Sequence, residues 1–243
     1  MTINEVTFNS VRFWTDLGAA LASPVEYPIP AEIKDKVVIK GANGSLTEST
    51  GYFSDLIIKT DFKVLIGKGG APGADKFNTL KRAINKTFND ISDNKLMFSD
   101  IPERCYIVKS CNVGAVTKTS DYEAKFKVEF TCDSFQYKPD EEPLPRVGTY
   151  DYGGDIPNKP VIEFTIESRG DAVLVCNDQE LRFEVNTGLM QINANPYSIV
   201  TKDGVPVQST GNAPIFRPGP NNIDIRGISY SNLKIYKKER YLG

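Results

Sequence analysis

Apolar and polar residues alternate over most of this chain, and one stretch breaks the alternation. Between Asp75 and Ile91 the spacing changes to three and four residues, with apolar positions at Phe77, Leu80, Ile84, Phe88 and Ile91. These positions share one face of a helix with 3.6 residues per turn. The spacing therefore predicts an amphipathic helix with Asp75 as its N-cap. Because a lone helix of this length is marginal in water, we expect it to dock on a sheet.

The residues around this helix have the period of two that is typical of β-strands. The clearest strand is Tyr122–Thr131, in which apolar residues alternate with lysine and glutamate. This pattern predicts one buried face and one wet face with salt pairs. A turn is expected at Asn9–Ser10. Strands are expected at Ile33–Ile39, Tyr52–Ile58 and Phe62–Ile66, which together would form a long hairpin. The segment Gly41-Ala42-Asn43-Gly44-Ser45 supplies a turn, because glycine and asparagine tolerate positive φ.

The composition changes after residue 137. Lys138–Pro145 is charged and rich in proline, and no periodicity returns before residue 160. From there seven short strands are predicted, at Val161–Ile166, Ala172–Cys176, Glu180–Val185, Gly188–Asn193, Ser198–Thr201, Ile223–Ile228 and Ser231–Tyr236. The pattern favours a mainly β protein with three parts: an α+β domain at 1–137, a linker at 138–159 and an antiparallel β-sandwich at 160–236.

The charge balance and the apolar runs exclude several classes of function. A net charge of −2 offers no basic footprint for nucleic acid. No apolar run is long enough to span a bilayer, so membrane insertion is not expected. The first residues lack the pattern of a secretory signal, which indicates synthesis and folding in cytoplasm.

The residues needed for common catalytic chemistry are scarce. The chain has no histidine, which removes the commonest general base and the Ser-His-Asp and Cys-His mechanisms. Its four cysteines show no C-x-x-C pairing, so neither a zinc site nor any other cofactor is expected. The glycine-rich segment 67–73 precedes the helix but lacks the Gly-Lys-Ser/Thr of a phosphate-binding loop. The acidic trio Asp140-Glu141-Glu142 fits a solvated linker better than a glycosidase pair. We therefore expect no enzyme activity.

A series of short motifs, taken in order, resembles the distal tail proteins (Dit) of long-tailed phages that infect Gram-positive bacteria. The matching pieces are Val38–Gly44 leading to Tyr52-Phe53, the helix with Leu96–Pro102, Phe126–Cys132, Pro160–Ile162 and Pro214–Ile223. The chain departs from the family in having Cys105-Tyr106 where aromatic pairs are usual. It also lacks the large insertion in the second half that some members use to bind carbohydrate.

The resemblance implies a ring-forming first domain, a galectin-like sandwich and a hexameric ring in the virion, at the tail tip, assembled in the host cytoplasm. Its partners would be other copies of itself, the tail tube protein, the tail-associated lysin or tail fibre protein, and receptor-binding or baseplate proteins. The hairpin residues Gly41, Ala42, Asn43, Gly44 and Ser45 are the candidate ring interface. The tail at 237–243 would dock on the first domain, with Tyr241 and Leu242 as anchors.

The alternative hypothesis is a carbohydrate-binding module that recognises host cell-wall polysaccharide through the sandwich. A sugar site of this kind needs exposed aromatic rings beside polar side chains. The candidate rings are Tyr150, Tyr152, Tyr197 and Tyr230. A third hypothesis, a glycoside hydrolase on the same sandwich, requires a pair of facing carboxylates that no spacing here defines.

Overall fold

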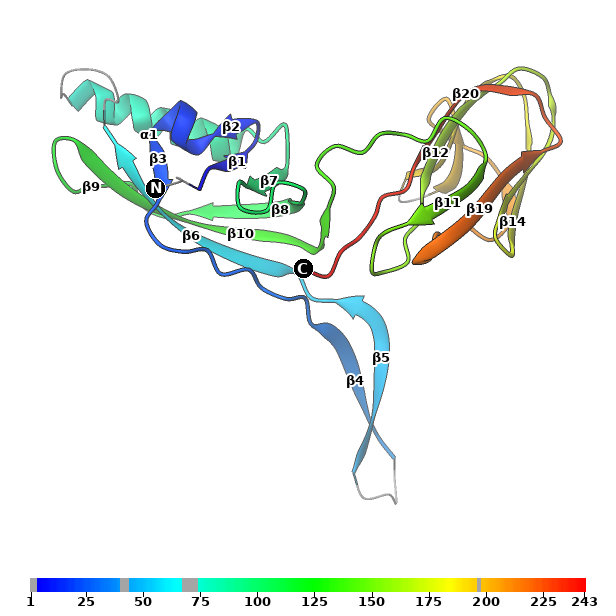
Figure 1. Ribbon diagram of the computed structural model, residues 1–243, viewed down its shortest axis with the longest axis horizontal. Helices are drawn as coiled ribbons and strands as arrows, with labels where there is room; N and C mark the ends of the chain where they lie inside the picture. The colour runs from blue at the N-terminus through cyan, green and yellow to red at the C-terminus, as the bar shows by residue number, and fades with distance from the viewer. Residues whose placement is uncertain (1–3, 40–43, 67–73, 196–197) are drawn as a thin grey trace. The chain divides into compact units, whose positions relative to one another are not determined.

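The computed structural model describes the chain except for residues 1–3, 40–43, 67–73 and 196–197, and it divides into two compact units (Figure 1). The first unit comprises Met1–Pro139 with Leu242–Gly243, and the second comprises Asp140–Tyr241. The division lies two residues from the predicted end of the first domain. Most of the segment predicted as a linker belongs to the second unit.

The first unit is built on an eight-stranded antiparallel sheet. Seven strands follow the order β2-β1-β7-β8-β10-β6-β3, and β9 pairs with β10. The strands are β1 (Val6–Phe8), β2 (Val11–Arg12), β3 (Ala19–Leu21), β6 (Leu56–Leu65), β7 (Lys95–Phe98), β8 (Cys105–Val113), β9 (Thr117–Lys118) and β10 (Glu123–Tyr137). A π-helical turn, η1 (Phe13–Leu17), connects β2 to β3. The turn predicted at Asn9–Ser10 is present, and both of its residues have positive φ.

The long strands β6 and β10 show the predicted division into a buried and a wet face. They pair over ten residues, and side chains on the buried face alternate with exposed ones along both strands. On the wet face Lys59 pairs with Glu129 at 3.4 Å, and Lys127 pairs with Asp61 at 3.1 Å. Each of these ion pairs joins residues that lie directly opposite in the ladder.

The helix α1 (Ala74–Asn89) lies along one face of this sheet (Figure 1). Ile84 and Phe88 are buried in the core of the unit, and Leu80 packs against its margin. Phe77 is only half-buried, and its ring lies 6.0 Å from the Lys81 ammonium. The stripe predicted from the sequence therefore forms core at its C-terminal half, whereas Phe77 lies outside the core cluster.

Both predicted ends of the helix need correction. The helix begins at Ala74, one residue before the predicted start at Asp75. It ends at Asn89, and Ile91 is 40% exposed. The side-chain amide of Asn9, in the β1–β2 turn, donates hydrogen bonds to the carbonyls of Thr87 and Asp90. These carbonyls would otherwise lack partners at the end of the helix, so the Asn9 side chain caps it.

The second unit is a β-sandwich of two five-stranded antiparallel sheets. The first has the order β11-β19-β13-β14-β18 and the second β17-β16-β15-β12-β20. The strands are β11 (Gly148–Tyr152), β12 (Val161–Ile166), β13 (Gly170–Cys176), β14 (Gln179–Val185), β15 (Gly188–Asn195), β16 (Ser198–Lys202), β17 (Val205–Pro206), β18 (Ser209–Gly211), β19 (Gly219–Arg226) and β20 (Tyr230–Tyr236). Both sheets contribute to one core, and each of the seven predicted strands is found.

The segment expected to be a linker contributes a strand and a core residue to this sandwich. Residues 148–152 form β11, which pairs with β19 along its whole length. Tyr152 is buried in the core, and Leu144 forms an isolated bridge with Ile235. Glu141, from the acidic trio, accepts a hydrogen bond from the backbone N–H of Lys238. Sequence reasoning missed this strand because it is short and only Tyr152 in it is buried, so no clear alternation marks it.

Candidate functional site

A two-stranded arm in the first unit has both of its strands exposed to solvent. It consists of β4 (Glu32–Val38) and β5 (Ser45–Phe53), which pair only with each other within the described residues (Figure 1). No residue of either strand is buried. The strand predicted through Tyr52–Ile58 is instead divided, because β5 ends at Phe53 and β6 begins at Leu56. An isolated hairpin is marginally stable in water, so a surface that covers this arm would stabilise it.

The register of the arm gives it two chemically different faces. Val37 lies opposite Leu46, and Asp35 lies opposite Glu48. Residues directly opposite point to the same side, and alternate residues share a face. One face, which we call the apolar arm face, therefore carries Ile33, Asp35, Val37, Leu46 and Glu48. The other face carries Lys34, Lys36, Thr47 and Ser49, with Val38 and Ser45 at its outer end.

The apolar arm face exposes large hydrophobic side chains to solvent. Leu46 is 56% exposed, and Tyr52, near the base of β5, is 73% exposed. A shallow hollow of about 580 Å³ lies between Ile33 and Tyr52 and includes the two acidic side chains Asp35 and Glu48. Exposed apolar residues gathered on one ribbon are typical of a protein-interaction surface.

The base of the arm is fixed to the sheet of the first unit. The Ser54 N–H donates to the Ala31 carbonyl at 2.9 Å, which closes the hairpin at its base. The Ser134 hydroxyl donates to the Phe53 carbonyl at 3.0 Å, and the Phe53 ring packs edge-on against Phe135 at 5.2 Å. These contacts attach β5 to β10. Sequence reasoning missed them, because Phe53 and Phe135 lie far apart in the chain.

The predicted interface residues lie at the tip of this arm. Gly44 and Ser45 are exposed there, and Gly44 has a φ of 105°. Gly41, Ala42 and Asn43 lie outside the described residues. Their role in a ring stays a prediction.

The C-terminal segment is held within the second unit as far as Tyr241. The Glu239 carboxylate is buried and accepts hydrogen bonds from the Gly153 N–H at 2.9 Å, the Lys237 ammonium at 2.6 Å and the Tyr241 hydroxyl at 2.5 Å. Docking of the tail on the first domain therefore remains a prediction for Leu242 alone, since the residues before it are bound in the sandwich.

Glu239→Ala should destabilise the second unit by on the order of 3 kcal/mol, because it removes one partner of a largely buried ion pair. The Gly153 N–H would also lose its acceptor. Thermal or urea unfolding followed by circular dichroism would measure this change. Glu163→Ala is a suitable control, since Glu163 lies on the half-exposed side of β12 and accepts from Gln191. Equal stabilities for the two variants would contradict the structural role of Glu239.

The tyrosines considered as sugar platforms are largely occupied by the sandwich itself. Tyr152 is buried and donates a hydrogen bond to the Ile156 carbonyl, and burial raises the pKa of its hydroxyl to about 12. Tyr150 donates to the Arg146 carbonyl, and the half-buried Tyr230 packs edge-on against Phe164. Tyr197 lies outside the described residues. These contacts give Tyr150, Tyr152 and Tyr230 structural roles.

The cysteines have the environment of core residues. All four lie in the described part of the chain and form no disulfide. Burial raises the pKa of the Cys132 thiol to about 12 and that of Cys176 to about 11. Both thiols are therefore protonated at neutral pH and are poor nucleophiles. Among the described residues no group of three or more cysteine or carboxylate side chains is placed to hold a metal ion. No described helix has the length and hydropathy needed to cross a membrane.

Comparison with solved structures relates both units and the arm to one protein. The chain superposes on the crystal structure of the Dit protein of phage SPP1 with a TM-score of 0.61, covering 98% of this chain and 99% of that one. The fold is that of a Dit protein. The two sequences are 15% identical, and no protein-family model or curated protein matches this sequence. The SPP1 Dit protein is described as a paradigm of the hub adsorption apparatus in phages that infect Gram-positive bacteria. The Dit fold predicted from the ordered motifs is thus confirmed.

Proposed function

We propose that this protein is a structural hub at the tail tip of a long-tailed phage that infects Gram-positive bacteria. Six copies would form a ring that joins the tail tube protein to the tail-associated lysin and to receptor-binding or baseplate proteins. The proposal assigns no catalysis to the chain. The observation that carries it is the end-to-end match in fold to the SPP1 hub protein, which includes both units.

The arm is the feature best suited to link neighbouring copies. Its strands leave backbone edges without a paired strand in the described chain, and its apolar face exposes Val37 and Leu46. Strand edges and apolar ribbons are the surfaces on which another chain adds. A contact between an arm and a different surface of the next copy is heterologous, and such contacts close into rings when the rotation between copies permits.

The mass of the purified full-length protein in solution tests the ring. Native mass spectrometry, with sedimentation velocity over a range of concentrations, should find a species of six chains. The tail tube protein, added as a separate purified component, should bind the ring and increase its mass. A protein that stays monomeric both alone and with the tail tube protein would overturn the proposal.

A further inference from the structure

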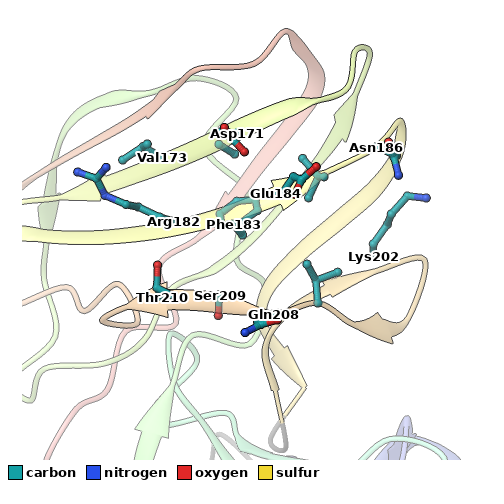
Figure 2. A pocket seen from close by; sticks show the side chains of 13 residues that line it. Asp171, Val173, Arg182, Phe183, Glu184, Asn186, Lys202, Gln208, Ser209 and Thr210 are labelled. Carbon is teal, nitrogen blue, oxygen red and sulfur yellow. The ribbon is translucent and has the colours of Figure 1, made fainter.

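A cleft opens in the second unit where the edge strands of its two sheets diverge. Strand β18 pairs with β14 only as far as Phe183 opposite Ser209, whereas β14 continues to Val185. The residues before Ser209 belong to the other sheet, where the Val207 N–H donates to the Val200 carbonyl at 3.0 Å. The cleft between these strands has a volume of about 620 Å³ and lies beside the last residues of β14 (Figure 2). This volume is in the range of ligand-binding sites.

Gly211 holds β18 close to β14 at the start of the cleft. Its φ is 99°, and a Cβ atom at this position would lie 2.1 Å from the Glu180 carbonyl oxygen. Only glycine permits so close an approach of the two strands. The next residue, Asn212, donates its N–H to the same carbonyl at 3.0 Å. The backbone therefore sets where the cleft begins.

Side chains of opposite charge lie in two rows on the side of the cleft formed by β13 and β14. In the acidic row Asp171 lies directly opposite Glu184. In the basic row, two residues earlier on β14, Arg182 lies opposite Val173. Side chains two residues apart on a strand point to the same face, so the two rows are about 7 Å apart on one surface. Figure 2 shows these side chains across the gap from the residues of β18.

The acidic row is only partly neutralised by the protein. Like charges at directly opposite positions destabilise a sheet. Arg169 pairs with Glu184 at 2.7 Å and relieves part of this repulsion. The Asp171 side chain makes no hydrogen bond or ion pair within the described residues. A basic side chain from a ligand, placed beside Asp171, would therefore stabilise this part of the sheet.

The basic row has hydrogen-bond donors available for a ligand. One terminal nitrogen of Arg182 donates to the Glu180 carboxylate at 2.6 Å, which orients the guanidinium. A guanidinium carries five N–H donors, so others remain to bind a carboxylate. The half-buried Val173 and Val207 add apolar surface. The other polar side chains of the lining that make no hydrogen bond within the described chain are Asn186, Gln208, Ser209 and Thr210.

This lining distinguishes between classes of ligand. Its four charges, on Asp171, Glu184, Arg182 and Lys202, cancel, so a polyanion gains no net attraction. The aromatic residue in the described lining, Phe183, is buried and offers no ring on which a sugar or a base could stack. An extended polypeptide matches the lining, because its side chains repeat at the spacing of the two rows. Its N–H and C=O groups can also pair with the amide and hydroxyl side chains.

We propose that this cleft binds an extended peptide segment of a partner protein, in which a basic and an acidic residue are two positions apart. The basic residue lies beside Asp171 and Glu184, and the acidic residue accepts hydrogen bonds from Arg182. Extended peptides that lie along the edge of a sheet are a recurring mode of protein recognition. The site is independent of the proposed ring, because every part of the cleft comes from one sandwich.

The test uses the full-length protein and the peptide Ser-Thr-Lys-Val-Glu-Val-Lys-Thr-Ser, capped at both ends. This peptide presents alternating charges in either chain direction. The spacing control, Ser-Thr-Val-Lys-Glu-Lys-Val-Thr-Ser, has the same composition with its charges on adjacent residues, which point to opposite faces of a strand. Isothermal titration calorimetry should find weaker binding of the control peptide. Poly(glycerol phosphate) and maltotriose serve as the polyanion and sugar comparators.

Arg182→Ala should weaken binding of the alternating peptide about tenfold, the loss expected for a hydrogen bond to a charged group. Asp171→Asn should also weaken it, because the carboxylate that attracts the basic residue is removed. Arg226→Ala provides the matched control. Arg226 pairs with Asp224 at 2.6 Å, as Arg182 pairs with Glu180, and both arginine side chains are 63% exposed. Both arginines flank Val173, but of the two only Arg182 lines the cleft.

Binding that is weakened in Arg182→Ala and kept in Arg226→Ala supports the site. Equal losses in the two arginine variants, or equal affinities for the two peptides, would overturn the proposal. So would the absence of binding of the alternating peptide below about 10 mM, or tighter binding of the polyanion or of the trisaccharide. The mass of the oligomer, measured separately, does not enter this test.

Discussion

Leu46→Glu should convert the proposed ring of six chains into monomers. Leu46 lies on the apolar arm face opposite Val37, beside the acidic pair Asp35 and Glu48. If this face is covered by a neighbouring copy, the new carboxylate is buried without a partner, and burial of an unpaired charge is strongly unfavourable. In the isolated chain the same side chain is exposed, so the melting temperature of the monomer should not change. Native mass spectrometry and thermal unfolding measure the two effects separately.

Thr47→Glu is the control, because Thr47 is the next residue in β5 and lies on the opposite face beside Lys36. This variant introduces the same charge at another exposed site and should leave the proposed ring intact. A Leu46→Glu protein that still forms the same oligomer would show that the apolar arm face is not the interface. Dissociation in both variants would instead contradict the assignment of the contact to one face.

Phe88→Ala should cost about 3–5 kcal/mol of the free energy of unfolding, the range for removing a buried aromatic ring. Phe88 stacks on Phe8 at 5.7 Å and meets Phe13, Phe126 and Phe130 at centroid distances of 5.7 to 6.5 Å. Its removal leaves a cavity where the helix meets the sheet. Urea unfolding of the first unit, followed by circular dichroism, gives the value.

Phe77→Ala serves as the comparison on the same helix. Because its ring is half-exposed and lies outside the core cluster, the substitution should cost about 1 kcal/mol or less. If the two variants lose similar stability, the helix does not dock through its C-terminal half. If Phe88→Ala unfolds like the parent but loses partner binding, the stripe is a contact surface and not core.

The sequence predicted those strands and helices in which the burial of one face sets the spacing of the apolar residues. The strands of the sandwich and the two faces of β10 were found this way, because one side of each strand meets a core. Turns such as Asn9–Ser10 were visible because their residues tolerate positive φ. The Dit fold required more than periodicity, and the order of short Gly, Pro and Asn motifs supplied it.

The features that sequence reasoning missed depend on residues far apart in the chain. The end of α1 is set by Asn9, about eighty residues earlier, and no local signal reveals that contact. Tyr152 was considered as an exposed ring, but the packing of β11 on β19 buries it. The cleft beside β14 arises where β18 changes sheets, a property of topology. The arm is likewise exposed because, among the described residues, no other strand pairs with β4 or β5.

The hydrogen bonds that hold residues 238–240 in the sandwich have a consequence for how the second unit could be exchanged during evolution. Glu141 near the start of this unit binds the backbone of Lys238, and the Asp155 N–H donates to the Arg240 carbonyl at 2.8 Å. The points where the chain enters and leaves the sandwich are therefore adjacent. Units with adjacent ends tolerate transplantation into a loop of another protein and circular permutation. Recombination could therefore replace the sandwich as a unit without changing the fold of the domain that carries it.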